Sequence, residues 1–120
     1  MSATFSTRKA GDVTVVDVSG RIVLGEPVSG LRSVLQDLIG QGDKKILLNL
    51  ANVTYLDSGG IGELVAAYTS MANRGGQVKL LNLTKRLSDL LQITKLYTVF
   101  EVHEDEARAL RSFSVRSASA

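Results

Sequence analysis

The sequence predicts a single α/β domain in which a central mixed β-sheet carries about four packed helices. Two observations lead to this fold class. Short β-branched or continuously apolar runs alternate along the chain with stretches that have helical apolar spacing. The chain also has 120 residues, of which 44% are hydrophobic, which suits one domain around one core. No internal repeat or linker composition divides it.

The chain is expected to open with two antiparallel strands and then a helix. Residues 13–18 are rich in valine and favour a strand, and residues 5–9 before Gly11 suit its hairpin partner. Pro27 suits a first helical turn, and Gly40 ends the helical pattern. The apolar positions of this helix are Val28, Leu31, Val34, Leu35, Leu38 and Ile39.

The middle of the chain predicts a buried strand followed directly by a helix. Residues 46–50 are almost continuously apolar, as expected of a strand that is covered on both faces. After the turn at Ser58, one apolar stripe with helical spacing runs until Gly75 and Gly76. The stripe consists of Ile61, Leu64, Val65, Tyr68, Met71 and Ala72.

The last third of the chain predicts two more strands and two more helices. Residues 78–83 favour a central strand, and Thr84 can cap a short helix that carries Leu87, Leu90 and Leu91. Residues 97–102 favour a final strand. The acidic residues 104–106 suit the start of a last helix, and the segment 113–120 is expected to be a flexible tail.

Composition excludes several classes of function. The chain has no cysteine, which excludes disulfides and thiolate metal sites. Its net charge of +2 comes from scattered basic residues, so direct nucleic-acid binding is not expected. The N-terminus lacks a signal-peptide pattern, and no apolar run is long enough for membrane insertion. A cytoplasmic location is therefore expected.

The turn between the buried strand and its helix is the candidate functional site. Such a turn presents Ser58 at the surface, beside the unpaired backbone N–H groups of a helix N-terminus, where a phosphate can be accommodated. On spacing alone, the more common explanation is that Ser58 itself caps the helix. The two roles are compatible, since Asp57 can cap the helix while Ser58 is modified.

The residues around this turn do not indicate an enzyme. The run Gly59-Gly60-Ile61-Gly62 has no third glycine at the spacing of a dinucleotide-binding loop, and no acidic residue directly follows the next strand to bind a ribose. Leu56 occupies the place of the first glycine of a nucleophile elbow. His103 lies far along the chain and is expected to be a solvated cap or loop residue. No catalytic residue, cofactor or metal site is predicted.

Several motifs together make the chain resemble a known family. They are Leu48-Asn49-Leu50, the turn Asp57-Ser58 with Gly60-Ile61-Gly62, and Lys85-Arg86-Leu87. In this order, over about residues 10–112, they resemble the STAS domain, and in particular the bacterial anti-sigma factor antagonists. The resemblance implies a STAS domain over residues 1–112.

The resemblance also implies a partner-switching function. In that family the serine after the aspartate is phosphorylated by an anti-sigma factor that is also a serine kinase, and here that position is Ser58. The unphosphorylated antagonist sequesters the kinase and frees a sigma factor, and a serine phosphatase resets the cycle. The implied partner-binding residues are Asp57, Ser58, Gly59, Gly60, Ile61 and Glu26.

The chain departs from the family pattern at two places. Gly59 stands where these antagonists usually carry serine or threonine. The segment 20–26 lacks the acidic residue that the family usually has after its second strand, and Glu26 is the nearest substitute. These departures leave an alternative open, in which the domain is a scaffold of a sensory or lipid-transport complex and is never phosphorylated.

Overall fold

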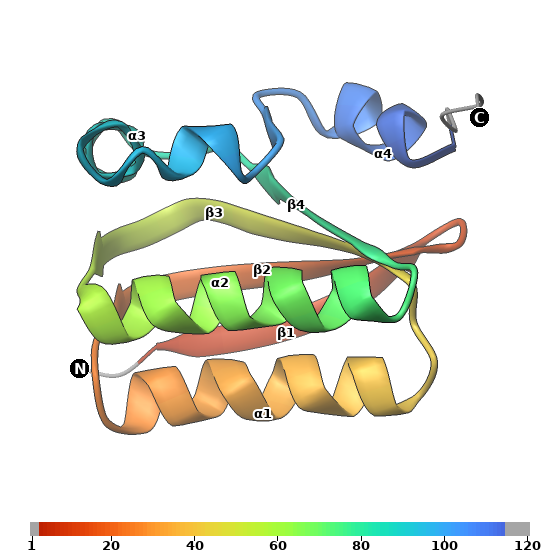
Figure 1. Cartoon of the computed structure of the whole chain (residues 1–120), viewed down its shortest axis with the longest axis horizontal. Coiled ribbons are helices and arrows are strands. Elements are labelled where there is room, and N and C mark those ends of the chain that lie inside the picture. The colour runs from red at the N-terminus through yellow and green to blue at the C-terminus, as the bar shows by residue number, and fades with distance from the viewer. Residues whose placement is uncertain (1–2, 115–120) are drawn as a thin grey trace.

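A computed structural model describes residues 3–114 as one five-stranded sheet with helices on its two faces (Figure 1). The elements in chain order are β1 (Thr4–Ala10), β2 (Val13–Ile22), α1 (Glu26–Gly40), β3 (Lys45–Leu56), α2 (Ser58–Asn73), β4 (Gln77–Leu81), α3 (Lys85–Thr94), a 3-10 helix η1 (Leu96–Thr98), β5 (Val102–His103) and α4 (Glu106–Ser114). This architecture confirms the predicted fold class.

The sheet is mixed, and its strands lie in the order of the sequence. β1 pairs antiparallel with β2, as the predicted hairpin requires. β2, β3, β4 and β5 then pair in parallel. Parallel neighbours need a crossover, and the helices between them supply it. As a result the carboxyl ends of β2, β3 and β4 lie at one edge of the sheet.

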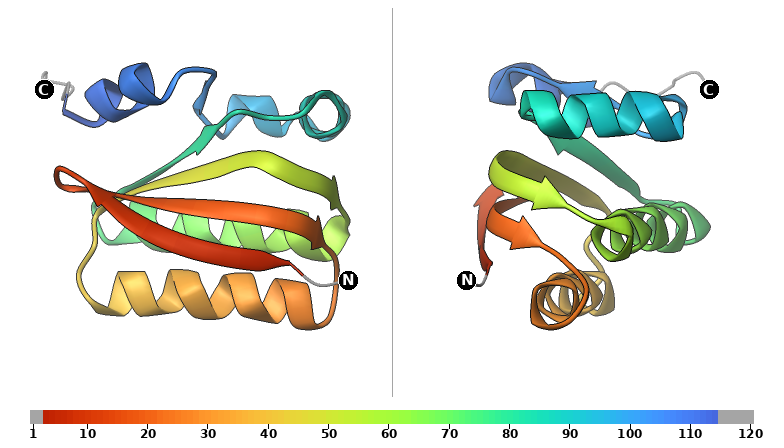
Figure 2. Two further views of the ribbon diagram at one scale, coloured as in Figure 1. Left: turned by 180° about the vertical axis from the view of Figure 1, so that it is seen from behind. Right: turned by 90° about the vertical axis from the view of Figure 1, so that its left-hand side faces the viewer.

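Apolar side chains cover both faces of β3, as the continuous run 46–50 predicts. Ile46, Leu48 and Leu50 belong to a large cluster that includes the buried residues of α1 and α2. Leu47 points the other way, into a smaller cluster with Ala109 and Phe113 of α4. The views in Figure 2 show α1 and α2 side by side, with α4 on the opposite side of the sheet.

Two expectations for the end of the chain differ from the structure. The predicted strand over residues 97–102 is wrong, since Leu96–Thr98 form a 3-10 turn and only Val102 and His103 are in β5. Phe100 instead packs edge-on against Tyr68, with 5.5 Å between ring centroids. Helix α4 continues to Ser114, two residues beyond the expected domain end, and residues 115–120 of the expected tail lie outside the described residues.

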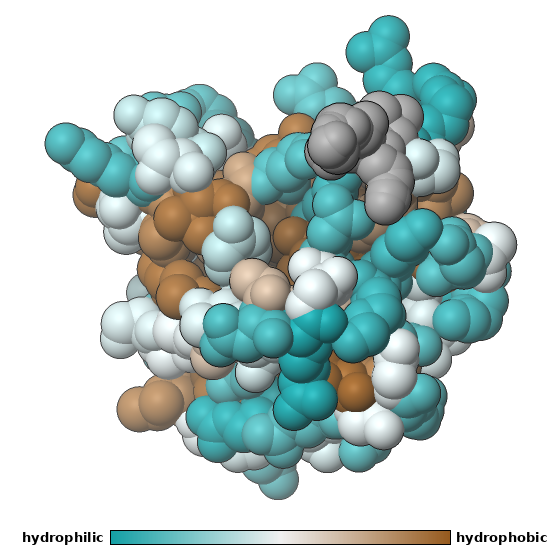
Figure 3. All heavy atoms as spheres, turned by 45° about the vertical axis from the view of Figure 1, so that its right-hand side comes forward, coloured by the Kyte–Doolittle hydropathy of each residue, from teal (hydrophilic) through white to brown (hydrophobic). Residues whose placement is uncertain are grey.

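The surface of residues 3–114 is mixed. On the face drawn in Figure 3, hydrophilic residues cover most of the surface, and hydrophobic atoms are visible between them in patches. No helix in this part of the chain combines the length and the apolar character that crossing a membrane requires.

Candidate functional site

The candidate site lies where the parallel strands end. Because β2, β3 and β4 run in the same direction, the segments that follow them meet at one edge of the sheet. These segments are the loop 23–25, Asp57 and the loop 82–84. The sequence predicted a site at the second of these segments, and the structure places the first directly against it.

Asp57 is the residue that joins the two segments. It is the N-cap of α2, and its Oδ1 accepts a hydrogen bond from the Gly60 backbone N at 3.0 Å. Its Oδ2 accepts one from the Leu24 backbone N at 2.9 Å. These amides stabilise the ionised form, so the pKa of Asp57 lies below its usual range. The cap expected at Ser58 on spacing alone is therefore wrong, and the alternative in which Asp57 caps the helix is confirmed.

Ser58 is the first residue of α2 and is exposed. Since Asp57 supplies the cap, the hydroxyl of Ser58 is not needed for that purpose. Within residues 3–114, this hydroxyl makes no hydrogen bond to another protein group. It stands at the positive end of a helix dipole, where an attached anion is tolerated.

The position of Gly60 in the structure differs from the exposed position that a partner-binding residue needs. It was expected to be among the partner-binding residues, but it is buried. A Cβ placed on it would lie 2.5 Å from the Ile22 backbone O and 2.7 Å from Leu56 Cδ1. Gly60 therefore allows the start of α2 to approach the end of β2, and only its neighbours can present a surface.

The other predicted residues divide between surface and core. Gly59 lies half-buried beside Asp57 and Leu24. Ile61 is half-buried and packs against the main core cluster. Glu26 is exposed as the first residue of α1, and no ion pair joins it to another residue of the described part of the chain.

Sequence reasoning missed Leu24. This residue is 74% exposed, and it lies in the loop that Asp57 holds. The sequence does not indicate that Leu24 is exposed, because a leucine in a loop belongs to no apolar pattern that would show whether its side chain is buried. The structure adds a bulky apolar side chain to the surface next to Ser58.

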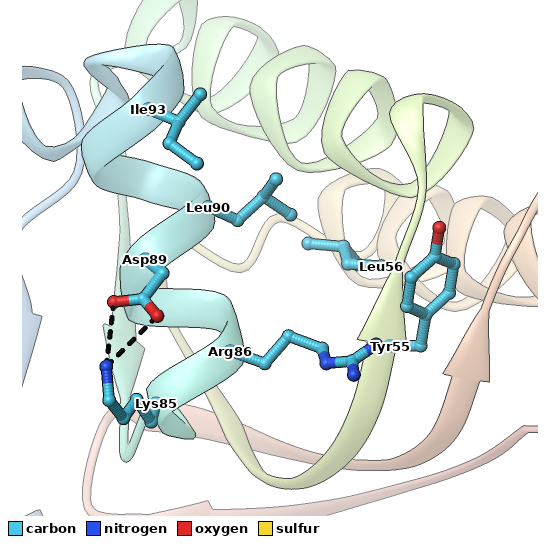
Figure 4. A pocket seen from close by; sticks show the side chains of 7 residues that line it. All are labelled: Tyr55, Leu56, Lys85, Arg86, Asp89, Leu90 and Ile93. Carbon is cyan, nitrogen blue, oxygen red and sulfur yellow. Dashed lines mark hydrogen bonds and ion pairs between the residues drawn. The ribbon is translucent and has the colours of Figure 1, made fainter.

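A second feature that sequence reasoning missed is a hollow beside the same edge of the sheet (Figure 4). Its volume is about 480 Å³, and it lies between the end of β3 and α3. Arg86 reaches from α3 toward Tyr55. The centroid of the Tyr55 ring lies 5.6 Å from the guanidinium carbon of Arg86 and 4.8 Å from that of Arg21. Lys85 pairs with Asp89 on the same helix at 3.1 Å.

The polar residues near the C-terminus have structural roles. His103 was expected to be solvated, but its side chain is only 19% exposed, and its Nε2 lies 2.6 Å from Glu101 Oε2. Glu101 also pairs with the buried Lys79 at 3.0 Å, and Lys79 donates to Ser112 Oγ at 2.8 Å. Residues 3–114 hold no group of three potential metal ligands.

A family model and a curated relative identify the family of this chain. The STAS domain model matches residues 4–109. The chain is 38% identical over 89 residues to the anti-sigma-B factor antagonist of Bacillus subtilis, a match that spans 72% of this chain and 78% of that protein. An anti-sigma factor antagonist from Mycobacterium paratuberculosis has a similar structure, with a TM-score of 0.84 at 20% identity over 92% of this chain and 93% of that one.

The Bacillus cell fate determinant SpoIIAA, solved in its phosphorylated form, is also similar in structure. The TM-score is 0.73 at 20% identity, over 91% of this chain and 98% of that one. At these identities the two structural likenesses show the fold alone.

Proposed function

Because the chain belongs to the STAS domain family, as one of its anti-sigma factor antagonists, we propose that it works by partner switching in the cytoplasm. Its unphosphorylated form binds an anti-sigma factor that is also a serine kinase, and phosphorylation of Ser58 releases that partner. The observation that carries the proposal is the position of Ser58, which is exposed at the first residue of α2 while Asp57 supplies the cap.

In this proposal the chain is a substrate and a binding partner, and the kinase is the enzyme. The Ser58 Oγ attacks the γ-phosphorus of ATP held by the kinase, and the bond from that phosphorus to ADP breaks. The proton of the hydroxyl passes to a base of the kinase. A serine phosphatase later hydrolyses the phosphoserine with water and restores the free hydroxyl.

The local charges explain why phosphorylation affects binding more than folding. A phosphoserine carries about −1.5 to −2 charges at neutral pH, and the N-terminus of α2 tolerates them. However, the carboxylate of the adjacent Asp57 is held in its ionised form. A partner that covers Ser58 would have to remove water from both negative groups, and burying uncompensated charge costs affinity.

The proposed contact surface follows from exposure around the turn. Ser58, Gly59 and Asp57 would face the partner directly, with Ile61 and Glu26 at its margins. Gly60 would contribute from the interior, by fixing where the helix begins.

The experiment that tests this function is affinity capture from the host's lysate with three baits: wild type, Ser58→Asp and Ser33→Asp. Ser33 is an exposed serine on α1, so its replacement adds the same charge away from the turn. We expect a kinase to be retained by wild type and by Ser33→Asp and lost with Ser58→Asp. Mass spectrometry of wild-type protein incubated with that kinase and ATP should find phosphate on Ser58.

Retention of the same partners by all three baits, with Ser58 unmodified, would contradict the proposal. It would support the scaffold function instead, in which the domain stays docked in a larger sensory or lipid-transport complex.

A further inference from the structure

An exposed leucine is fixed beside the proposed phosphorylation site. Leu24 is 74% exposed, although it lies in a short loop between a buried strand end and a helix. The backbone of this loop is held against the start of α2, because the Leu24 backbone N donates to Asp57 Oδ2 at 2.9 Å. The same carboxylate caps the helix that starts at Ser58. The backbone of Leu24 is therefore held in place relative to Ser58.

The side chain of Leu24 lies over Gly59. A Cβ built on Gly59 would be 2.8 Å from Leu24 Cδ1, 3.2 Å from Asp57 Oδ1 and 3.3 Å from Leu24 Cα. The shortest distance means that a side chain at position 59 would push the end of the Leu24 side chain out of its present place. Leu24 and a side chain at position 59 thus compete for one volume. The two places where the sequence departs from the family pattern, Gly59 and the segment 20–26, are in contact in the structure.

We propose that Leu24, seated on Gly59, is the residue of this chain that determines which kinase it binds, and that it inserts into an apolar pocket of that kinase. This inference rests on the function proposed above. Ser58 directly precedes Gly59 in the chain, so a protein surface that reaches the Ser58 hydroxyl also covers Leu24.

The chemistry of Leu24 sets what the partner must offer. Its side chain has no hydrogen-bonding group, so only apolar contact gains free energy when water is removed from it. A partner that places a charged or polar group there would leave that group without water and without a hydrogen bond, which is unfavourable. Leu24 therefore favours one class of partner surface and disfavours others.

The test measures the affinity of the purified kinase, once captured by wild type, for four forms of the full chain: wild type, Leu24→Ala, Gly59→Ser and the double variant. We expect Leu24→Ala to weaken binding about tenfold or more, as for an anchoring apolar residue. Gly59→Ser should weaken binding similarly, because its side chain displaces Leu24. The double variant should be no weaker than the poorer single variant, since both changes remove one contact.

Two further measurements separate this effect from misfolding and from a general effect of apolar truncation. The Gly59→Ser midpoint of thermal unfolding should stay near that of wild type, since Gly59 has no left-handed backbone angle and serine has the higher helix propensity. Val102→Ala truncates an aliphatic residue that is 37% exposed on β5. This control should bind the kinase as wild type does.

Unchanged affinity for Leu24→Ala, or effects of the two single changes that simply add, would overturn the inference. The outcome is distinguishable from failure of the proposed function. If Ser58→Asp still releases the kinase while Leu24→Ala binds normally, the switch stands and Leu24 does not determine the partner. If Ser58→Asp retains the kinase, the switch fails whatever Leu24 does.

Discussion

The Asp57 carboxylate has two structural tasks at the residue scale. One oxygen caps α2 and the other holds the loop 23–25. The sequence predicted a cap at this turn but did not decide which residue supplies it, because aspartate and serine are both common caps. It was not sufficient to predict the second, since the amide partner at Leu24 is far away in the chain and is brought close only by the parallel pairing of β2 and β3.

The link between Asp57 and its two amide partners depends on pH. Because the pKa of Asp57 is lowered in the folded protein, its ionised form stabilises the fold above the unfolded-state value of about 3.9. That stabilisation is lost as the pH falls through the lower, folded-state pKa. We expect the amide chemical shifts of Leu24 and Gly60 to titrate together in NMR spectra, with a midpoint below about 3.9.

The control for this titration is Asp57→Asn, which has no ionisable group at the cap. The shared transition of the two amides should disappear in that variant. A transition that survives the substitution would assign the titration to another group.

Replacing Gly60 or Gly62 by alanine, both near the start of α2, should change the stability of the protein in opposite directions. Gly60→Ala should lower the free energy of unfolding by about 1–3 kcal/mol, because the added Cβ meets the Ile22 backbone O at 2.5 Å. Gly62→Ala adds a Cβ that has nothing within 4 Å. It should raise stability by up to about 1 kcal/mol through helix propensity.

Urea unfolding of the two variants measures this contrast. If the two substitutions changed the free energy of unfolding equally, the start of α2 would lie farther from the end of β2 than it does in the structure. The sequence alone cannot separate these glycines, since both lie in one short run and only the fold places Ile22 against one of them.

At the scale of elements, α4 is held to the sheet by two kinds of contact. Phe113 is 3% exposed and packs in the smaller core cluster. Arg8 of β1 bridges Glu106 of α4 at 2.8 Å and Asp17 of β2 at 2.7 Å, but its side chain is 43% exposed. Solvent screens the ion pairs far more than it affects the packed ring.

We expect Phe113→Ala to lower the free energy of unfolding by about 3–5 kcal/mol. Arg8→Met keeps much of the aliphatic stem and removes both ion pairs, and it should cost at most about 1 kcal/mol. Urea denaturation of the two variants would measure the difference. If Arg8→Met cost more than Phe113→Ala, the ion pairs and not the ring would hold the helix.

The helices could be predicted from the sequence, and the last strand could not. Apolar spacing and caps located α1, α2 and α3, including Thr84, whose Oγ1 accepts from the Leu87 backbone N. The run 97–102 has strand-forming residue types, but Lys95 takes a left-handed conformation that starts a 3-10 turn, and Phe100 fills the core from there. Tertiary packing overrode local propensity in this segment.

At the scale of the whole molecule, the proposed switch should leave the fold intact. The five strands form one sheet and the helices pack against it, so thermal unfolding should be a single transition. Ser58→Asp places a negative charge at the N-terminus of α2, and the midpoint should be unchanged or raised by at most about 5 °C. Calorimetry measures both properties.

Ser114→Asp is the control, because it adds the same charge at the C-terminal end of α4, where the dipole disfavours it. Its midpoint should be unchanged or slightly lower. A marked loss of stability in Ser58→Asp alone would mean that phosphorylation acts through unfolding rather than through the contact surface.

The contact between Leu24 and Gly59 also constrains how such proteins can diverge after gene duplication. Because both side chains claim one volume, a copy that gains a hydroxyl residue at 59 while keeping leucine at 24 passes through a crowded intermediate. A copy that first shortens residue 24 does not. The order of the two substitutions therefore decides whether the intermediate form keeps Leu24 in the position that the proposed kinase contact needs.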